Sequence, residues 1–258
     1  MSLCEVTRQD GVYTLELNRP EAMNALSQAF LDEILAMLER MERDPEGRVL
    51  IVQSATPKAF CAGADLKERR GMDEDQVRAA VGKIRATVNR VGGLPIPTIA
   101  AVRGVALGGG LELALACDLR VMSKTATLGL TETRLAIIPG AGGTQRLSRL
   151  VGLARAKDLI LTGRRVNGEE AYEMGIAEYL ANDEEVTQRA RALASEIADG
   201  GPIALRQAKW ALEEGYGKPL EDALKVEEAA YEQVIHTEDR QEGLRAFAEK
   251  RKPRYQGR

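Results

Sequence analysis

Two glutamates, Glu112 and Glu132, stand beside glycine-rich segments, and this position makes them candidates for acid–base chemistry. Glu112 comes just inside a helix that we expect the glycine run 108–110 to open, and Glu132 precedes a second small-residue segment, 137–143. Amides in the first turn of a helix lack helical partners and carry partial positive charge, so they can stabilise an anionic oxygen. Two carboxylates in a partly apolar pocket can become a proton donor and a base. The sequence therefore indicates an anion-stabilising pocket with two acid–base groups.

Each of these features also has a purely structural interpretation. Three consecutive glycines before a helix are common where two backbones pack closely. Glu112 could be a carboxylate favoured by the helix dipole, and Glu132 could face solvent. The residues alone leave both interpretations open.

The composition excludes several classes of function. His236 is the only histidine, so a multi-histidine metal site is not available and acid–base work falls to other groups. The net charge of −3 argues against a dedicated nucleic-acid-binding protein, and no apolar run is long enough to span a membrane. The segment 104–110 also lacks the Gly-x-Gly-x-x-Gly order of a dinucleotide site. If the chain is an enzyme, its acid–base groups are therefore carboxylates, lysines, tyrosines or backbone groups.

The cysteines and the first residues favour the cytoplasm. Cys4, Cys61 and Cys117 are odd in number, far apart and in no metal-ligand pattern, which suits a reducing compartment. The first five residues lack the basic and apolar segments of a signal peptide.

Alternating strand and helix patterns must position the glutamates. Asp10-Gly11 separates two strand-like runs and predicts a hairpin, and Ser27 can cap a helix that ends near Arg43. Short apolar runs typical of buried strands follow at 49–52, 98–102 and 119–122. This order predicts an α/β fold with a largely parallel sheet.

Only helical patterns remain from about Asp183 onward, with Pro202 and Pro219 as helix starts. We therefore divide the chain into residues 1–195, an α/β core for binding and catalysis, and 196–258, a helical C-terminal region.

Four segments resemble the signature segments of the crotonase, or enoyl-CoA hydratase/isomerase, superfamily: residues 18–26, 59–67, 97–118 and 128–147. The most specific run is Ala-Leu-Gly-Gly-Gly-Leu-Glu-Leu-Ala at 106–114, followed by Ile-Pro-Gly-Ala-Gly-Gly at 138–143. The resemblance implies a crotonase-type spiral of ββα units with a helical C-terminal oligomerisation region. It also implies homo-oligomers, either trimers or hexamers.

The resemblance assigns roles to particular residues. Ala64 and Gly109 match the positions whose amides form the oxyanion hole around the thioester carbonyl. Glu112 and Glu132 match the two glutamates that hold the attacking water, and Glu132 would exchange the proton at Cα. Gly140 would help to position this water through its backbone.

The resemblance also implies how coenzyme A, as part of the substrate, is bound. Tyr231 and Lys250 fall where the family contacts the CoA of a neighbouring subunit. The loop that follows the adenine and pantetheine matches Ala62, Asp65, Leu66 and Lys67. For Asp65, capping or bracing the oxyanion loop is an alternative role. No metal or separate cofactor is implied.

The presence of both glutamates favours a hydratase within the family, because its isomerases often keep only the counterpart of Glu132. An isomerase and a non-catalytic CoA- or RNA-binding module remain alternatives.

The runs 111–118, 129–138 and 250–255 resemble the methylglutaconyl-CoA hydratases of leucine breakdown. Their animal form binds RNA through lysines on its first long helix, but residues 27–43 contain no lysine. We predict no RNA binding, and we expect residues 69–82 to line the acyl pocket.

Overall fold

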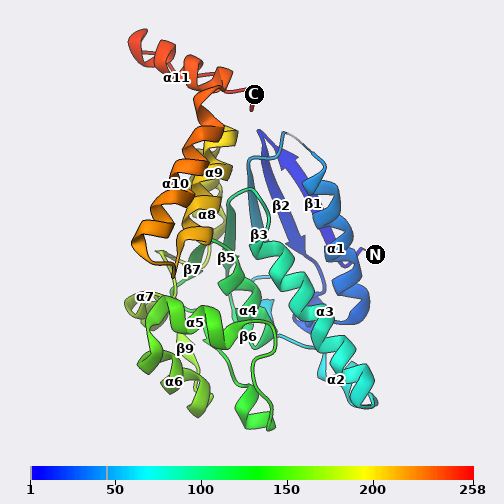
Figure 1. The fold of residues 1–258 in the computed structure, drawn as a ribbon. Helices are drawn as coiled ribbons and strands as arrows, with labels where there is room; N and C mark the ends of the chain where they lie inside the picture. The colour runs from blue at the N-terminus through cyan, green and yellow to red at the C-terminus, as the bar shows by residue number, and fades with distance from the viewer. Residues whose placement is uncertain (1, 45) are drawn as a thin grey trace.

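A six-stranded sheet forms the centre of the computed structural model, which describes residues 2–44 and 46–258 (Figure 1). The first two strands form the predicted hairpin, with Asp10 and Gly11 both at positive φ between them. All other pairings in this sheet are parallel, as the sequence predicts. In spatial order the strands are β1 (Cys4–Gln9), β2 (Val12–Leu17), β3 (Val49–Ser54), β5 (Thr98–Val102), β7 (Leu119–Ser123) and β10 (Tyr179–Ala181).

The central strands are buried on both faces. Leu50 and Val52 of β3 belong to the core cluster on one face of the sheet, and Val49 and Ile51 belong to a second cluster on the other face. Side chains alternate between the faces of a strand, so two covered faces require a continuous apolar run. This confirms the prediction from residues 49–52.

A second sheet consists of very short strands that the sequence analysis does not predict. Its strands, in spatial order, are β4 (Ala59–Cys61), β6 (Val105–Leu107), β8 (Thr127–Gly129) and β9 (Val166–Asn167). Strands of two or three residues are too short to show a period of two, which explains why the sequence did not reveal them. Gly104 enters this sheet at φ +62, and a Cβ there would lie 2.2 Å from the Lys58 carbonyl oxygen.

Helices α1 and α3 pack against each other beside the first sheet (Figure 1). Ser27 caps α1 as predicted, accepting a hydrogen bond from the Phe30 amide, and Asp73 and Gln76 form a capping box at the start of α3. The helices of this part are α1 (Gln28–Glu42), α2 (Leu66–Arg69), α3 (Glu74–Gly92), α4 (Gly109–Ala116), α5 (Gly143–Val151), α6 (Leu153–Thr162) and α7 (Gly168–Met174), with 3-10 helices η1 (Pro20–Ala22) and η2 (Glu132–Leu135).

Four helices complete the chain: α8 (Val186–Ala198), α9 (Pro202–Gly215), α10 (Leu220–Ile235) and α11 (Glu238–Ala248). Pro202 and Pro219 stand at the starts of α9 and α10, as predicted. The division at residues 195 and 196 falls inside α8 and stays a prediction. In the described residues, no helix combines the length and apolarity that crossing a bilayer requires.

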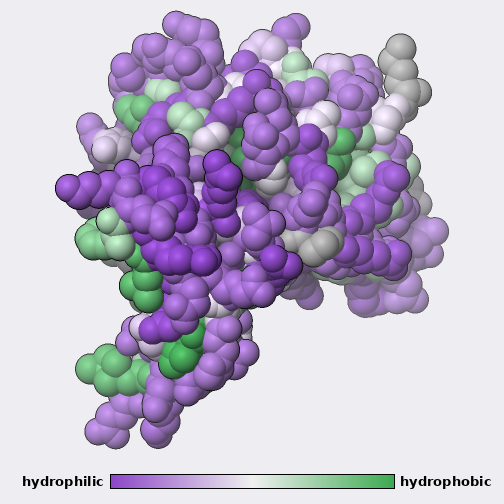
Figure 2. Space-filling view, turned by 90° about the horizontal axis from the view of Figure 1, so that it is seen from above, coloured by the Kyte–Doolittle hydropathy of each residue, from purple (hydrophilic) through white to green (hydrophobic). Residues whose placement is uncertain are grey.

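The last helix, α11, projects away from the rest of the molecule (Figure 1). Figure 2 shows hydrophobic residues on a part of the surface that projects from one side of the molecule, and Phe247 of α11 is 86% exposed. Leu220 and Leu224 of α10 are exposed as well. Large apolar side chains left in water on an extended arm are typical of a protein–protein interface.

Candidate active site

Close packing of α4 against β4 brings the two predicted amide donors together. A Cβ at Gly110 would lie 2.0 Å from the Cys61 carbonyl oxygen, so only glycine permits this approach. As a result, a Cβ built on Gly109 would lie only 3.8 Å from the Ala64 nitrogen. The two residues come from segments 45 positions apart, yet they meet at one point.

Both of these amides are free to bind a ligand. The Ala64 loop is fixed on either side, since the Leu26 amide donates to the Gly63 carbonyl at 2.7 Å and the Asp65 amide donates to the Leu26 carbonyl at 3.3 Å. Within the part of the chain that the structure describes, the Ala64 and Gly109 amides donate to no loop or side-chain acceptor. The Gly109 amide also lies in the first turn of α4, where it adds the positive end of the helix dipole.

Glu112 lines one cavity together with Ala64 and Gly109, and its carboxylate is held on one side. It is 3% exposed, and its Oε1 accepts hydrogen bonds from the amides of Ala141 (2.7 Å) and Gly143 (2.8 Å). Burial raises the pKa of this carboxyl above its ordinary value, and the two amide hydrogen bonds oppose that rise. One oxygen is therefore fixed, and the other is left for chemistry.

Glu132 reaches the cavity from η2 in a different setting. Burial raises its pKa to about 7, and the nearby charge of Glu112 adds to the rise. Its Oε2 is buried and has no hydrogen-bond partner among the described residues. A Cβ at Gly108 would lie 3.1 Å from its Oε1, so glycine at 108 makes room for this carboxyl. Two carboxyls thus reach one cavity from environments that differ in hydrogen bonding.

The cavity has a volume of about 1130 Å³. One side is apolar, formed by Val77, Val81 and Ile84 of α3 together with Ile137 and Ile138. Arg69, Val77 and Val81 belong to the segment 69–82, which therefore lines the cavity as predicted. The predicted site residues that also line it are Ala62, Ala64, Leu66, Gly109, Glu112, Glu132 and Gly140.

The other four predicted residues do not line this cavity: Asp65, Lys67, Tyr231 and Lys250. Tyr231 lies on α10 and is 64% exposed, and Lys250 follows α11 in a left-handed conformation with φ +53. Lys67 is exposed on α2. Contacts of Tyr231 and Lys250 with a neighbouring subunit's CoA stay a prediction.

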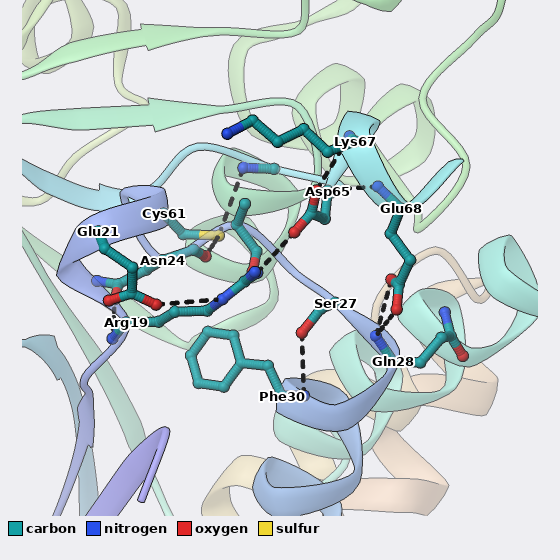
Figure 3. A network of polar contacts seen from close by, with 12 residues as sticks. Arg19, Glu21, Asn24, Ser27, Gln28, Phe30, Cys61, Asp65, Lys67 and Glu68 are labelled. Carbon is teal, nitrogen blue, oxygen red and sulfur yellow. Dashed lines mark hydrogen bonds and ion pairs between the residues drawn. The ribbon is translucent and has the colours of Figure 1, made fainter. Parts of the chain in front are cut away.

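The carboxylate of Asp65 braces the loop that carries Ala64 (Figure 3). It caps α2 by accepting from the amides of Lys67 (3.0 Å) and Glu68 (3.2 Å), and it pairs with Arg19 at 2.8 Å. Burial alone would raise its pKa, but the Arg19 and amide hydrogen bonds hold this pKa below its ordinary value. These contacts fit the bracing role that the sequence left as an alternative.

Asn24 anchors the same loop from the opposite side (Figure 3). This residue is fully buried, and its side-chain amide donates to Ser54 Oγ at 2.8 Å and to the Phe60 carbonyl at 3.0 Å. The Ala62 amide donates to the Met23 carbonyl. The segment 18–26, which resembles a family signature, therefore fixes the course of the chain into Ala64.

Four arginines on the cavity wall were missed by reasoning from sequence: Arg85, Arg134, Arg164 and Arg165. No motif surrounds them, although Arg85 continues the spacing of Val77 and Val81 along one face of α3, and this spacing could have revealed it. In the described residues, no group of three or more His, Cys, Asp or Glu side chains is arranged to hold a metal ion.

Comparisons with known proteins identify the family of the chain. Residues 7–258 match the family model described as enoyl-CoA hydratase/isomerase. The chain is 49% identical to a putative enoyl-CoA hydratase/isomerase of Bacillus subtilis, over 99% of this chain and 98% of the relative. It is 47% identical to the mitochondrial methylglutaconyl-CoA hydratase of Rattus norvegicus, over 96% of this chain and 80% of the relative. A crystal structure of an enoyl-CoA hydratase from Bacillus anthracis superimposes with a TM-score of 0.97 at 51% identity, over 99% of this chain and 100% of that one.

Proposed function

The chain belongs to the enoyl-CoA hydratase/isomerase family, and we propose that it is a hydratase that adds water to a 2-enoyl-CoA thioester. The observation that carries this proposal is a pair of carboxyls, the buried Glu112 and the half-buried Glu132, at one cavity beside two free backbone amides. Their hydrogen bonding differs, which suits one to act as base and the other as acid.

The Ala64 and Gly109 amides would bind the thioester oxygen. When water adds at Cβ, the electrons of the double bond move toward the carbonyl and place negative charge on this oxygen. Donors already fixed at that position stabilise the charge without reorganisation, and one such donor contributes about 3–4 kcal/mol in known cases.

The two glutamates would move the protons. Glu112, whose Oε1 is held by two amides, takes a proton from water through its other oxygen while the water oxygen bonds to Cβ. Glu132, with its pKa near 7, gives a proton to Cα and converts the enolate into the 3-hydroxyacyl thioester. Proton exchange with solvent then restores both groups. Each positioned acid or base contributes about 10²–10⁴-fold.

Isomerisation is the second reaction of this family. Moving a double bond needs one group that carries a proton between two carbons, and Glu132 alone could do this. The position of Glu112 at the same cavity, with a fixed orientation, favours hydration because it supplies the second group that activating water requires.

For the acyl chain, we propose the branched dicarboxylic thioester methylglutaconyl-CoA, an intermediate of leucine breakdown. Relatives described as methylglutaconyl-CoA hydratases from rat and human are 46–47% identical to this chain. The arginines on the cavity wall support a negatively charged substrate. The alternative is a simple short enoyl-CoA of β-oxidation.

We also propose that the active form is a trimer or hexamer in the cytoplasm. The exposed Phe247, Leu220 and Leu224 on the C-terminal helices support subunit contacts there. The three cysteines are buried and free, which suits a reducing compartment.

An assay with crotonyl-CoA, methylglutaconyl-CoA and a 3-enoyl-CoA, each given separately to the purified protein, tests the reaction. Loss of the conjugated thioester absorbance and a product heavier by one water would support hydration. Conversion of only the 3-enoyl substrate, with no gain in mass, would replace the hydratase by an isomerase. Turnover of none of the three would contradict both.

A further inference from the structure

One face of α3 forms the apolar side of the cavity and ends in a single cation. Val77, Val81 and Arg85 follow one another at intervals of four residues, so they lie along one line of the helix, and Ile84 stands beside them. A saturated acyl chain would gain from the valines and the isoleucine but would leave Arg85 without a partner. Arg85 is exposed, so its guanidinium is open to a ligand as well as to water.

The backbone beside the reactive centre fixes the Arg85 guanidinium. Its Nε donates to the Gly140 carbonyl at 2.7 Å, and the next residue, Ala141, donates its amide to Glu112. The charge of Arg85 is close enough to help lower the pKa of Glu112 against the effect of burial. Both terminal nitrogens of Arg85 make no hydrogen bond or ion pair within the described residues.

The other arginines on the wall fall into two groups: within the described residues the side chains of Arg69 and Arg165 make no hydrogen bond or ion pair, whereas those of Arg134 and Arg164 do. Arg164 pairs with Asp158 and Glu170, each at 2.7 Å, so its charge is already balanced. Arg134 donates its Nε to the Gly163 carbonyl at 3.2 Å, in the segment that leads to Arg164. Burial and Glu112 account for the raised pKa of Glu132, with no contribution from an arginine. Of the arginines that line the cavity, Arg85 is thus the one whose charge helps to lower the pKa of Glu112, as Arg146 outside the lining also does.

We propose that Arg85 binds a carboxylate at the far end of the acyl chain and so selects thioesters of dicarboxylic acids. The inference rests on the proposed hydratase function: the thioester oxygen lies at Ala64 and Gly109, the reacting carbons lie between the glutamates, and the rest of the acyl chain continues past Glu112 toward α3. A free guanidinium edge matches a carboxylate with two parallel hydrogen bonds. Without this cation, a carboxylate against the valine wall would lose solvation.

The test compares glutaconyl-CoA, which ends in a carboxylate, with 2-pentenoyl-CoA, which has the same chain length and no charge. Arg85→Gln removes the charge but keeps a side-chain amide that can donate to the Gly140 carbonyl. We expect the ratio of kcat/KM for glutaconyl-CoA to that for 2-pentenoyl-CoA to fall about 10- to 100-fold, as loss of a charge-assisted hydrogen bond implies. Arg78→Gln, on the same helix but outside the cavity, is the matched control.

Three results would overturn the proposal. If Arg85→Gln lowers both kcat/KM values in the same proportion, Arg85 only braces the Gly140 backbone. If the wild-type protein hydrates 2-pentenoyl-CoA and prefers it, no carboxylate is recognised. If Arg69→Gln, and not Arg85→Gln, lowers the ratio, another arginine binds the carboxylate. Failure of the wild type to hydrate either thioester would instead contradict the hydratase function itself.

Discussion

Replacing Glu132 by glutamine should abolish an acid–base group and at the same time stabilise the protein at neutral and alkaline pH. The Oε2 atom of this half-buried side chain is itself buried and has no hydrogen-bond partner among the described residues. Burial and the charge of Glu112 raise its pKa from 4.5 to about 7. The folded protein therefore disfavours the charged form of Glu132, and a neutral group of the same shape removes this cost.

The size and pH range of the effect follow from the raised pKa. The pKa of Glu132 is higher in the folded than in the unfolded chain, so ionisation of this carboxyl destabilises the folded protein. This loss of stability is negligible well below pH 4.5, grows between pH 4.5 and about 7, and is constant at higher pH. Each unit of pKa difference corresponds to about 1.4 kcal/mol, so the shift sets an upper limit of about 3 kcal/mol. Partial exposure to solvent reduces this figure, and we expect about 1–3 kcal/mol at pH 8.

Urea unfolding at pH 5 and pH 8, at one fixed protein concentration, measures the effect. The free energy of unfolding of Glu132→Gln should exceed that of the wild type at pH 8, and the difference should shrink to roughly a quarter of that value at pH 5. Glu173→Gln, at an exposed position on α7, is the control and should show no such difference. Equal stability of Glu132→Gln and wild type at pH 8 would show that the folded protein does not disfavour the charged form of Glu132. It would also remove the physical basis for Glu132 as an acid.

Three further predictions concern the same site. Gly143→Ala should lower kcat about 10-fold or more, because its Cβ would lie 3.0 Å from Glu112 Oε1; steady-state kinetics and a thermal melt would separate this loss from unfolding. The kcat/KM for hydration should fall about tenfold per pH unit above pH 7, since Glu132 must carry a proton, and a rise through pH 7 would contradict this role. Asp65→Asn should lower the free energy of unfolding by about 1–3 kcal/mol through its ion pair with Arg19, and an unchanged urea midpoint would count against the bracing role.

Local signals were sufficient to predict most of the larger elements. Asp10-Gly11 specifies a hairpin turn, Ser27 supplies a helix cap, and the apolar run 49–52 needs two covered faces. Each of these signals depends on neighbours within a few positions. The short strands β4, β6, β8 and β9 left no such signal, because their form depends on pairing with distant backbone.

The same distinction applies to the candidate site. The family resemblance indicated Glu112 and Glu132, but it did not show that amides of Ala141 and Gly143, about 30 positions away, hold the first carboxylate. Nor could it show that Asp65 turns away from the cavity to meet Arg19. Contacts between segments far apart in the sequence set the orientation and the pKa of each carboxyl. Such contacts form only in the folded chain, so the sequence does not reveal them.

The central claim is that Glu112 and Glu132 together add water to an enoyl thioester. Its most direct test is incorporation of labelled oxygen from water into the crotonyl-CoA product, measured for the wild type, Glu112→Gln and Glu132→Gln. We predict incorporation by the wild type and a rate at least about 100-fold lower in each variant. Full activity in either variant, or no labelled product from the wild type, would contradict the account.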